Sequence, residues 1–132
     1  MNMKECSNKR LNLRKKFELY KLPVKGEDMM IIMGNLLENA IEASMKCQIE
    51  ERRIELTIQQ INEIVFLDVK NSISDTVNLN GFQSQKADKI MHGWGMKNIK
   101  QIVDENHGEM QCACKEGMFD VNIIFMEDKE YE

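Results

Sequence analysis

This sequence of 132 residues lacks several features that mark whole classes of protein. No apolar run approaches the roughly 18 residues needed to cross a bilayer, and no signal-peptide pattern opens the chain. The formal net charge is −4, whereas a general nucleic-acid binder is normally basic. The sequence therefore predicts a soluble globular domain with one core, without direct membrane contact and without nucleic acid as a partner.

Cysteine is also used sparingly and without a metal-binding pattern. The four cysteines, Cys6, Cys47, Cys112 and Cys114, form no CxxC pair and no zinc spacing. Cys112 and Cys114 share one face of a predicted strand, with His107 upstream, but the ligand count and the spacing do not suit zinc. We therefore expect free thiols in a reducing cytosol.

Apolar periodicity predicts both strands and helices. Alternation of apolar and polar residues indicates strands in five segments: residues 11–19, 54–58, 64–70, 110–114 and 119–125. The second and third of these form a hairpin that turns at Asn62 and Glu63. A basic run beginning at Arg10 and continuing through residues 14–16 fits a solvated strand edge. Met96, Ile99 and Val103 mark the apolar face of a helix, which ends at Asn106 and Gly108.

The most informative stretch is another helix, residues 28–44, which reads DMMIIMGNLLENAIEAS. It is mostly apolar, and Asp28 is expected to be its N-cap. Asn35, Glu38, Asn39 and Glu42 interrupt it at spacings i, i+3, i+4 and i+7, which places them on one stripe. The stripe faces either solvent or a ligand. Asn is a poor interior helix former, so a pair of them favours a functional role.

A second informative stretch, residues 92–98, reads HGWGMKN. Glycines before a helix let a phosphate approach the backbone, and free N–H groups at the helix start favour anions. A tight turn into the helix explains the same glycines without a ligand. No GK[ST] follows as in a Walker loop, and Asn98 replaces the third glycine of a Rossmann fingerprint. The long polar segment before it, residues 71–91, is typical of a functional or disordered loop.

The order of these segments is more specific than any one of them. GNLLENAIEAS resembles the N box, and HGWGMKNIKQIV the second glycine box, of the ATP-binding catalytic domain of sensor histidine kinases, a group related to gyrase B, Hsp90 and MutL. The resemblance is strongest to the peptide-pheromone quorum-sensing receptor kinases. It implies an α/β (α+β) two-layer sandwich of the Bergerat type, with helices packed on one face of a mixed sheet. It covers residues 10–126, which leaves residues 1–9 as a linker remnant from an upstream dimerisation region and residues 127–132 as a frayed acidic tail.

The resemblance implies roles for the two asparagines of the helix. Asn39 would ligate the Mg²⁺ on the triphosphate, for which a side-chain carbonyl oxygen is a suitable hard ligand. Asn35 stands where the gyrase branch has a catalytic glutamate. An amide is no general base, so attack of water on ATP is expected to be slow. Glu38 and Glu42 are either N-box companions or solvated carboxylates.

The first glycine box departs from the family pattern. Asn71 stands where most of the family has an Asp that accepts a hydrogen bond from the adenine amino group, and Ser72 follows in place of glycine. The Asn71 carbonyl can still accept from that amine, and its NH₂ can donate to a ring nitrogen. Without a charged acceptor the affinity is expected to be modest.

The remaining site residues come from the lid and the second glycine box. Lys86 resembles a phosphate-facing lysine, although a solvent lysine fits equally well, and Gly93 and Gly95 would offer backbone amides to the phosphates. The resemblance implies Asn35 and Lys86 as the catalytic residues. The complete expected ATP site is Asn35, Asn39, Asn71, Lys86, His92, Gly93, Gly95, Met96 and Asn98.

The sequence contains no recognisable phosphoacceptor. His92 and His107 are its only histidines, and neither lies on a long helix with the flanks expected for an acceptor. The predicted function is therefore that of a catalytic domain in the cytoplasmic part of a membrane-anchored receptor. It would use ATP and Mg²⁺ to phosphorylate a histidine on the dimerisation domain of the same receptor, with a response regulator downstream. Two alternatives remain: an anti-sigma-factor-like serine kinase of the same fold, and a non-catalytic interaction module.

Overall fold

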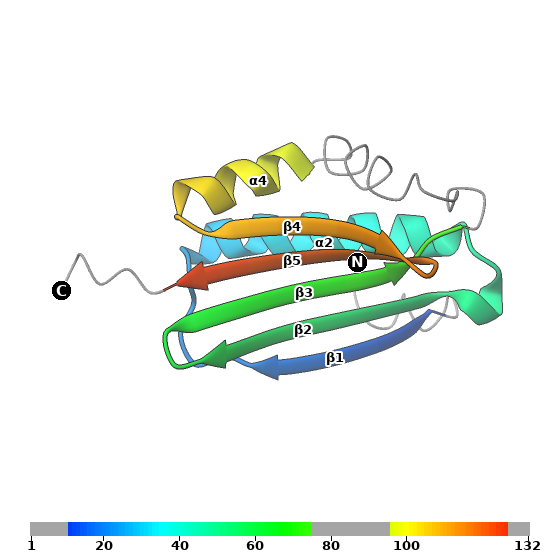
Figure 1. Ribbon diagram of the computed structural model, residues 1–132, viewed down its shortest axis with the longest axis horizontal. Helices are drawn as coiled ribbons and strands as arrows, with labels where there is room; N and C mark the ends of the chain where they lie inside the picture. The colour runs from blue at the N-terminus through cyan, green and yellow to red at the C-terminus, as the bar shows by residue number, and fades with distance from the viewer. Residues whose placement is uncertain (1–10, 75–95, 127–132) are drawn as a thin grey trace.

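A five-stranded mixed sheet forms the centre of the computed structural model, which describes residues 11–74 and 96–126 (Figure 1). The strand order is β1-β2-β3-β5-β4; β1 runs parallel to β2, and the other neighbours are antiparallel. In chain order the elements are β1 (Asn12–Glu18), α2 (Gly26–Met45), the short 3₁₀ helix η1 (Ile49–Glu51), β2 (Arg53–Ile61), β3 (Ile64–Ser72), α4 (Met96–Glu105), β4 (Glu109–Lys115) and β5 (Met118–Met126). The expected two-layer α+β architecture is confirmed.

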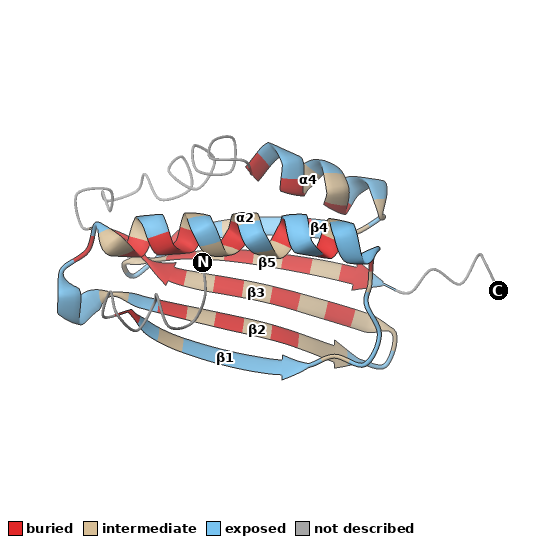
Figure 2. Cartoon of the chain, turned by 180° about the vertical axis from the view of Figure 1, so that it is seen from behind, coloured by how far each residue is buried: buried red, intermediate tan, exposed pale blue. Residues whose placement is uncertain are grey.

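Helix α2 lies across one face of the sheet, and α4 lies beside it (Figure 2). Met29, Ile32, Leu36 and Ala40 recur at helical spacing and are all buried against the strands. The expected N-cap at Asp28 is wrong, because the helix begins at Gly26 after Lys25. Asp28 instead lies in the first turn, where a carboxylate interacts favourably with the helix dipole. Neither helix of the described ranges is long and apolar enough to cross a membrane.

Strands β2 to β5 carry the predicted alternation of apolar and polar residues, and each is longer than the segment predicted for it. β3 continues through Asn71 and Ser72, beyond the predicted end at residue 70, because these residues pair with Phe119 and Met118 of β5. Two residues expected to open a loop are therefore held in the sheet.

β1 forms one edge of the sheet and is mostly exposed. Its basic residues Arg14, Lys15 and Lys16 face solvent, as predicted for a solvated edge, whereas Arg10 lies outside the described residues. Phe17 was expected on the apolar side of the strand, but 55% of its surface is exposed. Charged side chains on an edge strand oppose pairing with other chains.

The end of α4 is confirmed near Asn106, and the turn that follows the helix explains why residue 108 is a glycine. His107 has φ 59°, and the amide of Gly108 donates to Val103 O at 2.8 Å while that of His107 donates to Asp104 O at 3.1 Å. This pattern is a Schellman motif. A Cβ on Gly108 would lie 2.7 Å from Phe125 Cδ1 and 2.9 Å from the Ile124 carbonyl oxygen. Gly108 is therefore required by close packing against β5.

We predict that Gly108→Ala lowers the free energy of unfolding by about 1–3 kcal/mol, the usual cost of overpacking. The matched control is Gly34→Ala in α2, where a Cβ meets nothing within 4 Å. That change is expected to stabilise the domain by about 0.5–1 kcal/mol through helix propensity. Urea unfolding measures both variants, and equal stability of Gly108→Ala and the wild type would contradict the packing argument.

Candidate functional site

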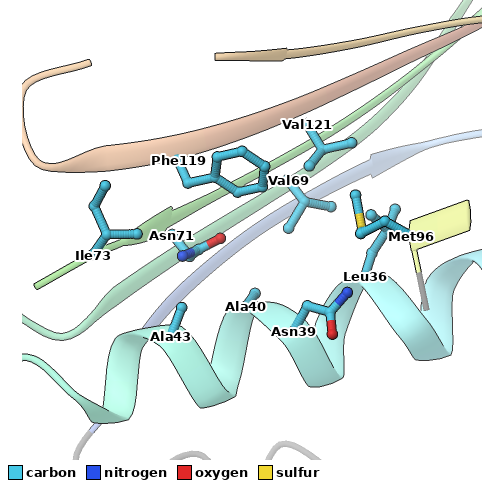
Figure 3. Close-up of a pocket in the computed structure, with 10 residues that line it drawn as sticks. All are labelled: Leu36, Asn39, Ala40, Ala43, Val69, Asn71, Ile73, Met96, Phe119 and Val121. Atoms are coloured by element: carbon cyan, nitrogen blue, oxygen red, sulfur yellow. The ribbon is translucent and has the colours of Figure 1, made fainter. Parts of the chain in front are cut away.

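A narrow hollow lies between α2 and the centre of the sheet (Figure 3). Most of its walls are apolar, and two carboxamides interrupt them. The lining residues are Leu36, Asn39, Ala40 and Ala43 of α2, Val69 and Asn71 of β3, Ile73, Met96 of α4, and Phe119 and Val121 of β5. The centre of a water-sized sphere can occupy only about 10 Å³ of the hollow, which is roughly the room needed for one water molecule. A larger ligand therefore requires its walls to move apart.

Asn39 contributes an unsatisfied donor to this hollow. Its side chain is half-buried on α2, and its Nδ2 is fully buried with no hydrogen-bond partner. A buried donor without an acceptor costs free energy, so such a group is commonly matched by a water or a ligand. Asn39 lines the hollow, and its role as a Mg²⁺ ligand stays a prediction.

The polar stripe of α2 divides into two parts. Asn35 is half-buried one turn before Asn39, but it is absent from the lining of the hollow. Glu38 and Glu42 are exposed. The two glutamates therefore face solvent, and Asn39 is the residue of the stripe that faces the hollow.

Asn71 lies at the end of β3, where it is 3% exposed. Its Nδ2 donates to the carbonyl oxygen of Ser72 at 3.0 Å. The Asn71 NH₂ was expected to donate to a ring nitrogen of adenine. One of its two N–H groups is instead bonded to Ser72. Within residues 11–74 and 96–126, the carboxamide oxygen of Asn71 accepts no hydrogen bond, and Asn71 lines the hollow.

The other predicted site residues fall into three groups. Met96, the first residue of α4, is fully buried and lines the hollow. Asn98 is exposed on α4 and does not line it. Four predicted residues lie outside the described ranges: Lys86, His92, Gly93 and Gly95.

The structure adds residues that the sequence interpretation missed. Val69, Phe119 and Val121 supply the sheet side of the hollow; strand alternation placed them in the core but gave no indication that they meet Asn39. Ser44 is fully buried at the end of α2 and bonded to Ser72. The sequence indicated the burial of Ser44 in one way only, because Ser44 follows the apolar Ala40 by four residues and so lies on the same face of the helix.

Protein side chains alone do not form a metal centre in the described ranges, where no group of three or more His, Cys, Asp or Glu residues could hold an ion. Mg²⁺ commonly binds through one or two protein ligands together with phosphate oxygens and water. A single side-chain oxygen, such as that of Asn39, suits this mode of binding. The donor set of the hollow therefore fits a metal that arrives with a nucleotide.

Comparison with protein families gives a match to the GHKL domain over residues 24–126. The chain belongs to the GHKL domain family. The expected resemblance to the catalytic ATP-binding domain of sensor histidine kinases is thereby confirmed, as is the fold. The subgroup of pheromone receptors stays a prediction.

Relatives agree with this assignment. The probable C4-dicarboxylate sensor kinase of Bacillus subtilis (strain 168) is 28% identical over 95 residues, covering 67% of this chain and 17% of the relative's length. The nucleotide-free catalytic domain of histidine kinase ThkA has a TM-score of 0.71 at 16% identity and covers 94% of this chain and 84% of that one. ThkA in complex with the response regulator protein TrrA has a TM-score of 0.68 at 17% identity, over 98% and 38% of the respective chains. At these identities the ThkA structures show a shared fold.

A second polar cluster of this GHKL domain lies on the opposite face of the sheet. Asp120 pairs across the strands with Lys70, and Asp68 is its diagonal neighbour. Burial, the hydrogen bond that protonated Asp120 donates to the Asp68 carboxylate, and the negative charge of Asp68 together raise the pKa of Asp120 from 3.8 to about 7, with Lys70 opposing and Glu55 adding to the shift. One carboxylate oxygen of Asp120 is buried without a partner. The folded state thus favours protonated Asp120.

This raised pKa predicts the pH dependence of stability. Because folded Asp120 holds its proton more tightly than the unfolded chain, its contribution to stability falls as pH rises from about 4 to about 7. Asp120→Asn should remove this decline and be more stable than the wild type at pH 8. Urea unfolding between pH 5 and pH 8 measures it, with Asp104→Asn on the exposed side of α4 as the control. A wild-type decline that persists unchanged in Asp120→Asn would show that another group causes it.

Proposed function

We propose that this domain binds Mg-ATP in the hollow between α2 and the sheet and donates the γ-phosphoryl group to a histidine on a separate dimerisation domain. The observation that carries the proposal is the buried, unpartnered amide of Asn39, which faces the same hollow as Asn71 in a GHKL fold. The apolar walls suit the flat faces of an adenine base. The amide of Asn71 suits the polar edge of that base, and the amide of Asn39 suits the phosphate end of the nucleotide.

Asn39 and Asn71 have different tasks in this proposal. The Asn39 oxygen would hold Mg²⁺, and its buried Nδ2 would gain an acceptor from the nucleotide or from ordered water. Bound Mg²⁺ would neutralise charge on the triphosphate during phosphoryl transfer. Asn71, at the other end of the hollow, would accept a hydrogen bond from the adenine amino group.

The composition of the hollow favours transfer over hydrolysis. Its ten lining residues include no Asp, Glu or His, and so no group that activates water. Asn35, one turn before Asn39, is an amide as well. Glu38, the nearest carboxylate in sequence, is exposed. Within the described residues the site therefore positions ATP without a general base, as suits an enzyme that keeps ATP for a protein acceptor.

The rest of the reaction depends on groups beyond the described residues. Lys86, His92, Gly93 and Gly95 would complete the phosphate end, with Asn98 from α4. The acceptor histidine would come from the dimerisation domain of the same receptor, and a response regulator would take the phosphoryl group next, as the ThkA–TrrA complex suggests by analogy. The domain would be the cytoplasmic part of a membrane-anchored receptor, in the pheromone-sensing subgroup.

A non-catalytic interaction module is the second candidate function. The narrowness of the hollow, which has room for about one water molecule, favours this alternative. The absence of glycines after Asn71 points the same way, because Ser72 is fixed in β3. Nucleotide binding separates the two candidates.

Asn39→Ala is expected to weaken Mg-ATP binding by about tenfold or more, since a ligand to a charged group is lost. The fold should persist, because the side chain makes no hydrogen bond through Nδ2 that folding requires. Displacement of a fluorescent nucleotide measures the affinity, and thermal unfolding checks the fold. Glu42→Ala, one turn away on the exposed side of α2, is the matched control. Equal affinities of Asn39→Ala and the wild type would remove Asn39 from the site.

A second prediction concerns phosphoryl transfer by the domain alone. With labelled ATP and Mg²⁺ it should gain no acid-labile, base-stable phosphate, because the sequence gives neither His92 nor His107 the flanks expected of a phosphoacceptor histidine. His107 ends α4 in a Schellman turn. Adding the dimerisation helices, in cis or as a separate chain, should yield phosphohistidine on those helices. Phosphohistidine on the domain itself would refute this division of labour.

A further inference from the structure

Three polar residues are buried in the described ranges, and all three belong to one hydrogen-bonded group. Ser44 is fully buried, Asn71 is 3% exposed and Ser72 is 5% exposed. Ser44 ends α2, whereas Asn71 and Ser72 end β3. Buried polar networks that are fully satisfied hold their members in one arrangement, because every alternative leaves a group unpaired.

The two serines join α2 to the ends of two strands. Ser72 Oγ lies 3.2 Å from Ser44 Oγ and accepts from the backbone amide of Arg53 at 3.0 Å. Ser44 Oγ lies 3.3 Å from the Arg53 carbonyl oxygen and 3.5 Å from the Ser72 carbonyl oxygen. The Ser72 backbone is thus held from α2 and from the start of β2 at once.

That backbone determines the orientation of the Asn71 side chain. The Ser72 carbonyl oxygen, 3.0 Å from the Asn71 carboxamide, only accepts hydrogen bonds, so the amide must turn its NH₂ toward it. The carboxamide oxygen then faces the other way. Figure 3 shows this oxygen on the side of the other lining residues, and the nitrogen toward the end where Ile73 lies.

We propose that Ser44 and Ser72 are positioning residues that hold the Asn71 carboxamide in one orientation, so that this end of the hollow presents the carboxamide oxygen, an acceptor, to a purine base. The proposal rests on the proposed function, because it assumes that a nucleotide base enters this hollow. An unanchored asparagine reads an amino group or a carbonyl equally well by turning over. The anchored one accepts from the amino group of adenine and opposes the carbonyl of hypoxanthine or guanine. The two serines thereby give a neutral amide the selectivity of a carboxylate.

The experiment compares Mg-ATP with Mg-ITP, which carries a carbonyl where ATP carries the amino group. The wild type is expected to bind ATP about tenfold or more tightly, since ITP leaves two acceptors facing each other. Ser44→Ala and Ser72→Ala should bring the ratio of the two dissociation constants toward one, whereas Ser72→Thr keeps the hydroxyl and the ratio. Thr57→Ala, on the opposite face of the sheet, is the control for loss of a hydroxyl elsewhere.

The ratio is the decisive readout, because a general loss of stability weakens both nucleotides alike. If ATP binds and the ratio stays at the wild-type value in both serine-to-alanine variants, this inference is overturned and the proposed function stands. Equal binding of ATP and ITP by the wild type overturns it as well. If no nucleotide binds, the proposed function fails and the inference fails with it.

A measurement on the wild type alone keeps the test decisive if the serine variants do not fold. The triphosphate of purine riboside has neither the amino group nor the carbonyl at this position of the base. A fixed acceptor predicts that ATP binds most tightly, purine riboside triphosphate less tightly and ITP least. A carboxamide that turns freely would bind ITP more tightly than purine riboside triphosphate, and that order would overturn the proposal.

Discussion

The apolar side of α2 packs against the central strands, and the candidate site takes its position from that contact. Leu36 and Ala40 meet the sheet on the same helix that carries Asn39. Any displacement of α2 therefore moves Asn39 relative to Asn71 on β3. The hydroxyls of Ser44 and Ser72 fix the far end of this contact, because their hydrogen bonds bridge the end of the helix and the end of the strand.

The same contact limits the chemistry available to the hollow. It brings apolar side chains and two amides together, without a carboxylate or an imidazole among the lining residues. Such a surface suits the binding and orientation of a ligand, and its lining has no group that takes a proton at neutral pH. Membership in the GHKL family, with its histidine-kinase relatives, agrees with a domain that presents a bound nucleotide to an acceptor elsewhere.

Local patterns predicted most of the fold, because helix and strand periods are set by neighbours in sequence. The mostly apolar stretch identified α2, although Met30 and Ile31 on that helix are exposed, and alternation identified every strand. The ends of elements depended on less local contacts: β3 extends to Ser72 because β5 pairs with it. The start of α2 was misplaced because Asp28 is a good cap by type, although the helix needs no side-chain cap at Lys25.

The candidate site was predictable only in part, for a related reason. The family resemblance placed Asn39 and Asn71 in one site. Periodicity alone cannot do so, because the two residues lie in different elements. The bond between Ser44 and Ser72 joins residues 28 apart, and the raised pKa of Asp120 depends on Asp68 in another strand. Neither follows from a local pattern, since the bond arises from the packing of α2 on the end of β3 and the pKa shift from the register of the completed sheet.

Calorimetric titration of the unmodified domain with Mg-ATP tests the central claim most directly. The account predicts saturable binding at one site, of modest affinity, which weakens when a chelator removes Mg²⁺. It also predicts that the hollow widens on binding, so protection of the amides of β3 and α2 from hydrogen exchange should change in the same titration. Absence of saturable binding at millimolar nucleotide would contradict the account and favour a non-catalytic interaction module.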